Sequence, residues 1–312
     1  MSQGKSDIFG LVGTITYDTI TCPSRRAFSR LGGILYQAAA LCGLGKEVHL
    51  FSNLGEELLP IVKKVTSKWP GCKTRGLCIV PGPGNRVYLR YPARGERVEV
   101  LESCVPALNP DPLIHKASRF SLLIAVVNSG RDFSFQDWRN IVGAVKAPIW
   151  LDIHSLPLSF VLHRPRSYRP LTRWRDWVKG IAYLQANEKE LAAMLGDPGS
   201  LPSLARIKRF GREALELGLR AVFITLGKKG VLVTAPGASR VLEPPAVRGV
   251  VDTTGCGDVF CAATAARLVA GANPVEAASF GVVLASQAAR AAGAEETHAQ
   301  VRSFSLRAGC FR

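Results

Sequence analysis

The sequence predicts an α/β fold with a doubly wound, mostly parallel β-sheet, and two observations carry this prediction. Short, continuously apolar runs recur along the chain, and segments with helical periodicity separate them. Continuous apolar strands joined through helices are typical of a parallel sheet that helices cover on both faces. A chain of 312 residues can form one large α/β domain or two smaller ones. The sequence contains no internal repeat or low-complexity tract.

The expected strands and helices alternate in order along the chain. The first strand is "DIFGLVG", and the helix "LYQAAALCGLG" that follows ends at Gly45, a residue suited to cap a helix C-terminus. We expect strands at residues 7–13, 47–55, 121–129, 148–155, 180–187 and 221–227, and helices at 35–45, 135–146, 188–196, 203–218 and 258–271.

Residues 74–103 break this alternation. The segments "RVYLRY" and "RVEVLE" alternate polar and apolar residues with period two, between turns rich in Gly and Pro. This pattern predicts antiparallel strands with one exposed face. We therefore expect a small inserted β-sheet, either a lid or a surface for a partner, with residues 14–31 as a second candidate part of it. A homodimer through this lid is a candidate assembly.

Composition and charge narrow the class of protein. The chain has no apolar run long enough to span a membrane, and its N-terminus lacks the apolar stretch of a secretory signal. Its eight cysteines form no CxxC pair, which favours a cytoplasmic protein with reduced thiols. The net charge of +16 is compatible with a polyanion or a phosphorylated small molecule as partner. Arginines mix with aromatics at 163–179, but this stretch favours a solvated loop before a short amphipathic helix over a nucleic-acid site.

The segment "VDTTGCGDVFCAA" combines two glycines with an acid at the start of a helical pattern. Gly255 and Gly257 allow a tight turn, and the free amides of the helix N-terminus that follows favour an anion. Asp258 in the first turn is unusual beside an anion unless it accepts a proton from an attacking hydroxyl. An anion hole and a carboxylate base suit phosphoryl transfer to an alcohol. An ordinary capped helix with Asp258 as dipole partner explains the same local sequence equally well.

This segment resembles the C-terminal signature of the ribokinase-like (PfkB) carbohydrate kinase family, with Cys256 in place of the usual Ala. The resemblance implies that residues 1–312 form a single ribokinase-like kinase domain with a sheet of the ribokinase type, and it makes Asp258 the general base. It also implies that the amides of Gly255, Cys256, Gly257 and Asp258 form the anion hole and that Thr254 lies beside the nucleotide.

Two N-terminal motifs resemble the acceptor-binding part of the same family. "GTITYD" at 13–18 ends at Asp18, where the family holds substrate hydroxyls with a carboxylate that can accept two hydrogen bonds. "GGILYQAA" matches the family's helix entry with Gly32 and Gly33, and Gln37 stands where Asn is usual. The resemblance implies that these residues bind the substrate.

Two later motifs resemble the family's nucleotide and metal residues. "NEKE" matches Asn-x-x-Glu, which implies that Asn187 lies near the phosphates and that Glu190 holds Mg²⁺ through water; by itself it is an ordinary N-capped helix start. "TLGKKG" implies that Thr225 and Gly227 contact the nucleotide and that Gly230 permits the turn. A Walker-type phosphate loop is absent from the sequence, which disfavours a P-loop kinase.

Together these motifs predict an ATP-dependent phosphotransferase acting on a hydroxyl of a sugar, a sugar phosphate or a nucleoside. ATP and Mg²⁺ are the implied cofactors, and a monovalent cation such as K⁺ is a further candidate. The lid arginines Arg86 and Arg90 are candidates to meet a substrate phosphate, or are simply exposed. The alternative is a non-catalytic binding or regulatory protein with the same fold.

Overall fold

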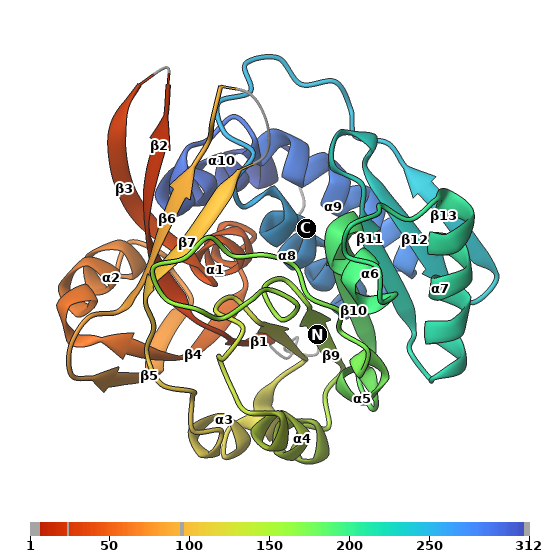
Figure 1. Ribbon diagram of the computed structural model, residues 1–312, viewed down its shortest axis with the longest axis horizontal. Coiled ribbons are helices and arrows are strands. Elements are labelled where there is room, and N and C mark those ends of the chain that lie inside the picture. The colour runs from red at the N-terminus through yellow and green to blue at the C-terminus, as the bar shows by residue number, and fades with distance from the viewer. Residues whose placement is uncertain (1–6, 24, 94–96, 309–312) are drawn as a thin grey trace, which may run out of the picture.

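The computed structural model describes residues 7–23, 25–93 and 97–308, and it contains two β-sheets (Figure 1). The larger sheet has nine strands, and the apolar runs of the sequence form its centre. Its strands are β1 (Ile8–Val12), β4 (Glu47–Gly55), β5 (Cys72–Val80), β8 (Leu122–Val126), β9 (Ile149–Asp152), β10 (Tyr183–Asn187), β11 (Ala221–Thr225), β12 (Val231–Ala235) and β13 (Ala238–Leu242).

The larger sheet is parallel except at one edge, as the sequence predicts. Its strand order is β13-β12-β11-β10-β9-β8-β1-β4-β5, and only β12 and β13 run antiparallel to their neighbours among these strands. The chain moves outward from β1 through β4 to β5, and then restarts at β8 on the other side of β1. The strand order therefore reverses between β1 and β8, the position at which open α/β sheets bind ligands beyond the carboxyl ends of their strands.

Helices cover both faces of this sheet and create two separate cores. Side chains of α1, α8 and α9 pack on one face with Phe9 and Leu11, and side chains of α4, α5 and α7 pack on the other with Val12. All nine residues of α1 are buried, and small alanines let it approach α8 closely. The helices are α1 (Leu35–Gly43), α2 (Leu59–Thr66), α3 (Asp111–Ile114), α4 (Phe135–Ala144), α5 (Trp174–Val178), α6 (Glu188–Met194), α7 (Leu204–Glu216), α8 (Cys256–Val269), α9 (Pro274–Ala288) and α10 (Gly293–Ala308), with 3₁₀ turns at Glu56–Leu58, Ala117–Arg119 and Gly227–Lys229.

The smaller sheet is the predicted lid, and it rises above α1 and α8 in Figure 1. Its strands are β2 (Ile15–Cys22), β3 (Arg25–Gly33), β6 (Asn85–Arg90) and β7 (Val98–Ser103), in the order β3-β2-β6-β7. The contribution of residues 14–31 is thus confirmed. The predicted start of the insertion near residue 74 is wrong, because β5 pairs with β4 in the larger sheet. The β2–β6 pair is also parallel, because these strands come from two separate excursions of the chain.

Three further features of the described residues bear on the expectations about the chain as a whole. Six of the described cysteines are free thiols, namely Cys42, Cys72, Cys78, Cys104, Cys256 and Cys261. Among the described helices, none combines the length and apolar character needed to cross a bilayer. The stretch 163–179 is a largely exposed loop that leads into the short helix α5. Its Arg166 departs from this description, because its side chain is 1% exposed and pairs with Glu99 of the lid at 2.9 Å.

Candidate active site

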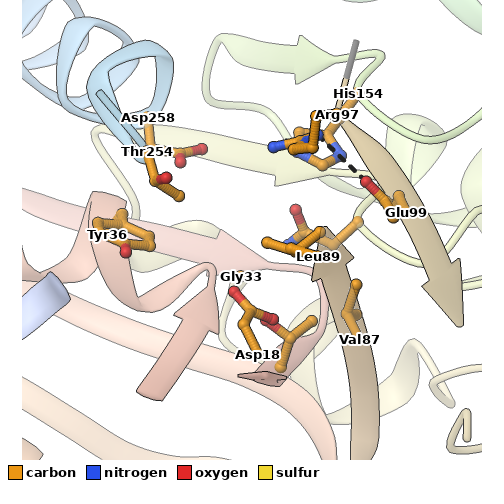
Figure 2. Close-up of a pocket in the computed structure, with 12 residues that line it drawn as sticks. Asp18, Gly33, Tyr36, Val87, Leu89, Arg97, Glu99, His154, Thr254 and Asp258 are labelled. Carbon is orange, nitrogen blue, oxygen red and sulfur yellow. Dashed lines mark hydrogen bonds and ion pairs between the residues drawn. The ribbon is translucent and has the colours of Figure 1, made fainter. Parts of the chain in front are cut away.

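A cavity of about 70 Å³ lies between the lid and the carboxyl ends of the central strands (Figure 2). It opens at the β1–β8 reversal, where the Asn128 side chain beyond β8 donates to the Thr14 carbonyl oxygen beyond β1 at 3.0 Å. Asp18 and Asp258 come from opposite ends of the sequence, and both point into the cavity in Figure 2. The lining residues are Thr16, Asp18, Gly33, Tyr36, Val87, Leu89, Arg97, Glu99, Asn128, His154, Thr254 and Asp258.

Asp258 lies in the first turn of α8, where the sequence places it, and its carboxyl group is buried. Its Oδ1 accepts a hydrogen bond from Gln37 Nε2 at 2.5 Å. Burial raises the pKa of Asp258 well above its usual range, and the nearby carboxyl of Asp152 raises it further. Gln37 is fully buried and is not among the cavity-lining residues. Its amide therefore orients Asp258, and its predicted contact with substrate stays a prediction.

The turn before α8 has the geometry that the glycine pattern predicts, and Gly255 is the residue that requires it. Gly255 has φ +83° in the left-handed region, and a Cβ there would lie 2.3 Å from Tyr36 Cδ1. A Cβ at Gly257 would meet only Gln185 Nε2, at 3.7 Å. Burial raises the pKa of the Cys256 thiol to about 12, so this substitution for Ala adds no charge to the turn.

Asp18 occupies the lid side of the cavity, at the position expected from "GTITYD". Burial raises the pKa of Asp18 to about 6. Gly32 makes room for this carboxylate, because a Cβ there would lie 2.3 Å from Asp18 Oδ2 and 2.8 Å from Thr16 Oγ1. Gly33 lines the cavity with φ +62°, and a Cβ there would lie 2.1 Å from the Thr14 carbonyl oxygen. The two glycines therefore permit the tight β2–β3 approach that holds Asp18.

Two buried carboxyl groups, those of Asp152 and Glu190, lie near Asp258. Burial is the main reason that the pKa of Asp152, Glu190 and Asp258 is raised, in the case of Glu190 to about 8, and each also feels one of the others. Gln185 Nε2 links this group to the α8 turn by donating to Asp152 Oδ2 at 3.0 Å and to the Gly257 carbonyl oxygen at 3.1 Å. Carboxylate oxygens are the ligands that Mg²⁺ prefers, directly or through water, so these residues fit a hydrated Mg²⁺ that offsets their repulsion. Among the described residues, no group of three His, Cys, Asp or Glu forms a ready-made cage.

The motif "NEKE" forms a capping box at the start of α6. Asn187 Oδ1 accepts from the amides of Lys189 and Glu190, and the Glu190 carboxylate accepts from the Asn187 amide at 2.8 Å. The motif therefore forms an N-capped helix start, as its ordinary structural interpretation predicts. Glu190 is nevertheless only 6% exposed and lies near Asp258, so the same cap holds its carboxylate toward the cluster.

The predicted nucleotide loop follows β11 at the same edge of the sheet. Asn187 and Thr225 are paired in register at the carboxyl ends of β10 and β11. Gly230 has φ +94°, and a Cβ there would lie 1.9 Å from the Leu242 carbonyl oxygen. Gly227 has φ +56°, and a Cβ there would meet nothing within 4 Å. The loop is thus tightly turned and open at Gly227, which fits the approach of a phosphate chain.

Sequence reasoning missed much of the cavity wall. Arg97, Glu99 and His154 form the wall opposite Asp258 in Figure 2, and Arg97 donates to Glu99 at 3.2 Å. Burial lowers the pKa of His154 to about 4, so its ring is neutral near pH 7. Asn128 and Asp152 were detectable in principle, because Asp152 is the last residue of the buried strand β9 and Asn128 lies two residues beyond the buried strand β8. Arg97 and Glu99 carried no such signal, since only the folding of the lid brings them to the cavity.

Replacement of Asp18 by Asn should stabilise the fold at neutral pH while it weakens acceptor binding. Because the pKa of Asp18 is higher in the folded protein, ionisation of Asp18 destabilises the fold. This loss of stability is absent below pH 3.8 and complete above about pH 6. We expect Asp18→Asn to gain up to about 3 kcal/mol at pH 7 and almost nothing near pH 4. Urea unfolding at both pH values measures this, with the exposed Asp176→Asn as control. A variant less stable than wild type at pH 7 would contradict the burial argument.

Comparisons with known proteins agree with this geometry. Residues 157–300 match the model of the pfkB family carbohydrate kinases. The chain is 34% identical to ribokinase of Arabidopsis thaliana over 121 residues, which is 38% of this chain and 31% of that protein. It is 37% identical to ribokinase of Bacillus subtilis over 125 residues, or 40% of this chain and 37% of that protein. The matched segments thus span about a third of these curated relatives.

Solved structures extend the similarity over the whole chain. Ribokinase of Thermotoga maritima superposes with a TM-score of 0.74 at 21% identity, over 96% of this chain and 99% of that one. Nucleoside kinase of Burkholderia thailandensis in complex with inosine superposes with a TM-score of 0.73 at 16% identity, over 97% of this chain and 99% of that one. The chain therefore has the ribokinase fold over almost its whole length, and its residues 157–300 are similar to the pfkB family of carbohydrate kinases.

Proposed function

We propose that this protein is an ATP-dependent kinase that phosphorylates a hydroxyl group of an uncharged sugar or nucleoside. The observation that carries the proposal is the pairing of Asp258 with the α8 N-terminus in the cavity that also holds Asp18. Asp18 accepts hydrogen bonds from hydroxyls of the acceptor, and Asp258 faces the hydroxyl that reacts. The pfkB-family match and the ribose and ATP complex of the Arabidopsis thaliana ribokinase support this class of reaction.

The chemistry follows from the positions of these groups. Asp258 accepts the proton of the reacting hydroxyl as its oxygen forms a bond to the γ-phosphorus, and the bond from that phosphorus to the departing ADP oxygen breaks. The amides at Gly255, Cys256 and Gly257 stabilise negative charge on the transferring group. Gln37 holds the Asp258 carboxylate in place through its 2.5 Å hydrogen bond. The raised pKa makes Asp258 a stronger base than an exposed Asp.

The nucleotide would lie along the carboxyl ends of β10 and β11. Thr225 and Gly227 would contact its phosphates, with Thr254 at the other side of the reacting group. Bound Mg²⁺ supplies positive charge that neutralises the phosphates. Glu190, together with Asp152, would hold its water molecules, which is consistent with the mutually raised pKa values of these carboxyls.

The charges around the cavity favour an acceptor without a phosphate. Asp18, Glu99 and Asp258 are carboxyl groups, and Arg97, the one cation among the lining residues that the structure describes, already pairs with Glu99. A phosphate on the acceptor would meet like charges that cost binding energy. The two lid arginines considered above do not change this. Arg86 forms a double hydrogen bond with Glu57, and Arg90 is exposed and outside the lining.

A turnover screen tests the proposal directly. The purified protein, ATP and Mg²⁺ are combined with panels of neutral sugars, sugar phosphates and nucleosides, and ADP release is followed. We expect acceptor-dependent ADP release within the uncharged panels and none with sugar phosphates. Binding of nucleotide and acceptor without turnover in any panel would favour the non-catalytic alternative.

Replacement of Glu190 by Gln tests the metal role. We expect the variant to need about 10-fold more Mg²⁺ for its half-maximal rate, because one charge of the carboxylate cluster is lost. The acceptor KM should change little. The capping box makes some loss of melting temperature unavoidable, so the Mg²⁺ dependence is the decisive measurement. Identical Mg²⁺ curves for wild type and variant would assign Glu190 to the helix cap alone.

We keep a homodimer through the lid as a separate proposal. The outer side chains of the lid form polar pairs, Thr19 with Ser29 at 3.1 Å and Thr21 with Tyr88 at 3.0 Å. Such a surface favours a polar, reversible contact rather than an apolar obligate one. Light scattering over a range of protein concentrations would detect it, and a constant monomer mass would contradict it.

A further inference from the structure

Arg30 connects the lid to the loop that leads into the α8 turn. It lies on β3 directly opposite Asp18 on β2. Its Nη2 lies 2.5 Å from Asp252 Oδ2, and the two side chains are only 12% and 11% exposed. Opposed residues on paired antiparallel strands project to the same side of the sheet. The same face of the lid therefore carries Asp18, the proposed acceptor-binding carboxylate, and Arg30, which reaches Asp252 in the loop before α8.

Asp252 organises that loop from within. Its Oδ1 accepts a hydrogen bond from the Thr254 amide at 2.9 Å, one residue before Gly255. The amides of Val251 and Asp252 both donate to the Ala289 carbonyl oxygen, at 2.8 and 3.1 Å. The Asp252 carboxylate thus joins the lid, through Arg30, to the residue that precedes the left-handed turn at Gly255.

A third segment, the connection from α9 to α10, packs against Arg30. A Cβ at Gly293 would lie 3.3 Å from Arg30 Cδ, so the guanidinium lies beside the connection from α9 to α10. All three guanidinium nitrogens of Arg30 and the Oδ2 atom of Asp252 are buried and have no hydrogen bond among the described residues, so the contact between Nη2 and Oδ2 is an ion pair. The ion pair with Asp252 is therefore the main contact that offsets burial of this charge. Arg30 and Asp252 also line a neighbouring cavity of about 270 Å³ between the lid and the loop.

This arrangement leaves no place for a monovalent cation at Asp252. An ion such as K⁺ needs several oxygen ligands at once, and the loop offers one carboxylate. Its Oδ2 is paired with Arg30, and its Oδ1 accepts from Thr254. The carbonyl oxygen of Ala289, a nearby backbone ligand, already accepts two hydrogen bonds. The monovalent cation considered from the sequence therefore does not fit these residues.

We propose that the Arg30 guanidinium supplies the fixed positive charge at Asp252 that orders the anion-hole turn, so that the protein works without a monovalent cation. Arg30 is a positioning residue in this proposal, which rests on the proposed kinase function. An arginine suits the role because it stays charged at any physiological pH and its geometry is fixed by the chain. Because Arg30 belongs to the lid, one ion pair connects the sheet that carries Asp18 to the turn before α8.

The first experiment compares cations on the wild-type protein. Turnover is measured in KCl, NaCl and choline chloride at equal ionic strength, and we expect rates within about two-fold of one another. In Arg30→Ala we expect a rate about 10²-fold lower in choline chloride, the size typical of a displaced catalytic element. Addition of KCl or of millimolar guanidinium should restore part of that rate. Arg26→Ala, an exposed arginine on the same strand, serves as the matched control and should behave as wild type.

A second readout does not depend on turnover. The melting temperature of Arg30→Ala should rise by about 4 °C or more when choline chloride is replaced by KCl, because an ion bound to the emptied site stabilises the folded state. Wild type should show no such shift. If Arg30→Ala does not fold, Arg30→Lys, which keeps the charge on a shorter donor group, takes its place and should remain independent of K⁺.

Two results would overturn the proposal. One is a wild-type rate that rises several-fold from choline chloride to KCl, and the other is an Arg30→Ala rate equal to wild type in choline chloride. A loss of rate in Arg30→Ala that neither KCl nor guanidinium relieves would also count against it, since it would assign Arg30 to direct ligand contact. If wild type phosphorylates no acceptor, the kinase function fails, and the melting temperatures still decide whether Arg30 occupies a cation position.

Discussion

Replacement of Asp258 by Asn should lower kcat by about 10²–10⁴-fold, the usual contribution of a general base. The amide is nearly the same size and can still pair with Gln37, but it cannot accept the proton of the acceptor hydroxyl. The fold should survive, because the substitution removes a buried carboxyl whose pKa burial has raised. Steady-state turnover of the purified variant, with its circular dichroism spectrum, checks both expectations.

The pH dependence of kcat gives an independent test of the same residue. A base with a raised pKa must lose its proton before it can act, so the wild-type kcat should increase as pH rises through the Asp258 pKa. Asp258→Asn should lack this rise.

Glu276→Gln provides the matched control for Asp258→Asn, because Glu276 is an exposed acid in the first turn of the neighbouring helix α9. If Asp258 merely complements a helix dipole, both variants should lose only about 0.3–1 kcal/mol of stability and keep their turnover.

Replacement of Gly255 by Ala should damage both the fold and the reaction. The left-handed φ of +83° costs an Ala about 1–2 kcal/mol. The new Cβ would also lie 2.3 Å from the Tyr36 ring, and overpacking of this kind costs about 1–3 kcal/mol more. We expect a loss of about 2–4 kcal/mol in urea unfolding and a large loss of turnover, because the amides that follow Gly255 would move.

A second substitution separates these two causes. Tyr36→Ala removes the ring, so in a double-mutant cycle Gly255→Ala should cost less stability in the Tyr36→Ala background than in wild type, because the clash is gone while the backbone strain remains. Cys256→Ala is the control one residue further along, where the change is small and the thiol is neutral, and it should keep near-normal stability and turnover. A Gly255→Ala protein as stable as wild type would show that the turn does not need its left-handed conformation.

The six central parallel strands and five of the helices were predictable from the sequence because each of these elements carries its own signal, whereas α2, α9, α10, β12 and β13 were not predicted. Buried parallel strands are continuously apolar, and their carboxyl ends are marked by polar residues such as Asn187. The α8 turn was predictable for a similar reason, since a left-handed residue before a helix strongly favours Gly, and Gly255 has that conformation. The lid boundary was missed because β5 contains charged residues at an exposed edge and therefore resembles a half-exposed lid strand.

The sequence by itself determined the local geometry of this protein, namely the parallel strands, the glycine turn before α8 and the acid in the first turn of that helix, because these depend on residues close together in the chain. Only the tertiary structure decided which distant side chains meet. It placed Gln37 on Asp258, brought Asp152 and Glu190 behind it, and paired Arg30 with Asp252. The physical reason is that such contacts join residues separated by as many as 222 positions (252 minus 30), and the pairing of buried charges leaves no periodic signal in either segment.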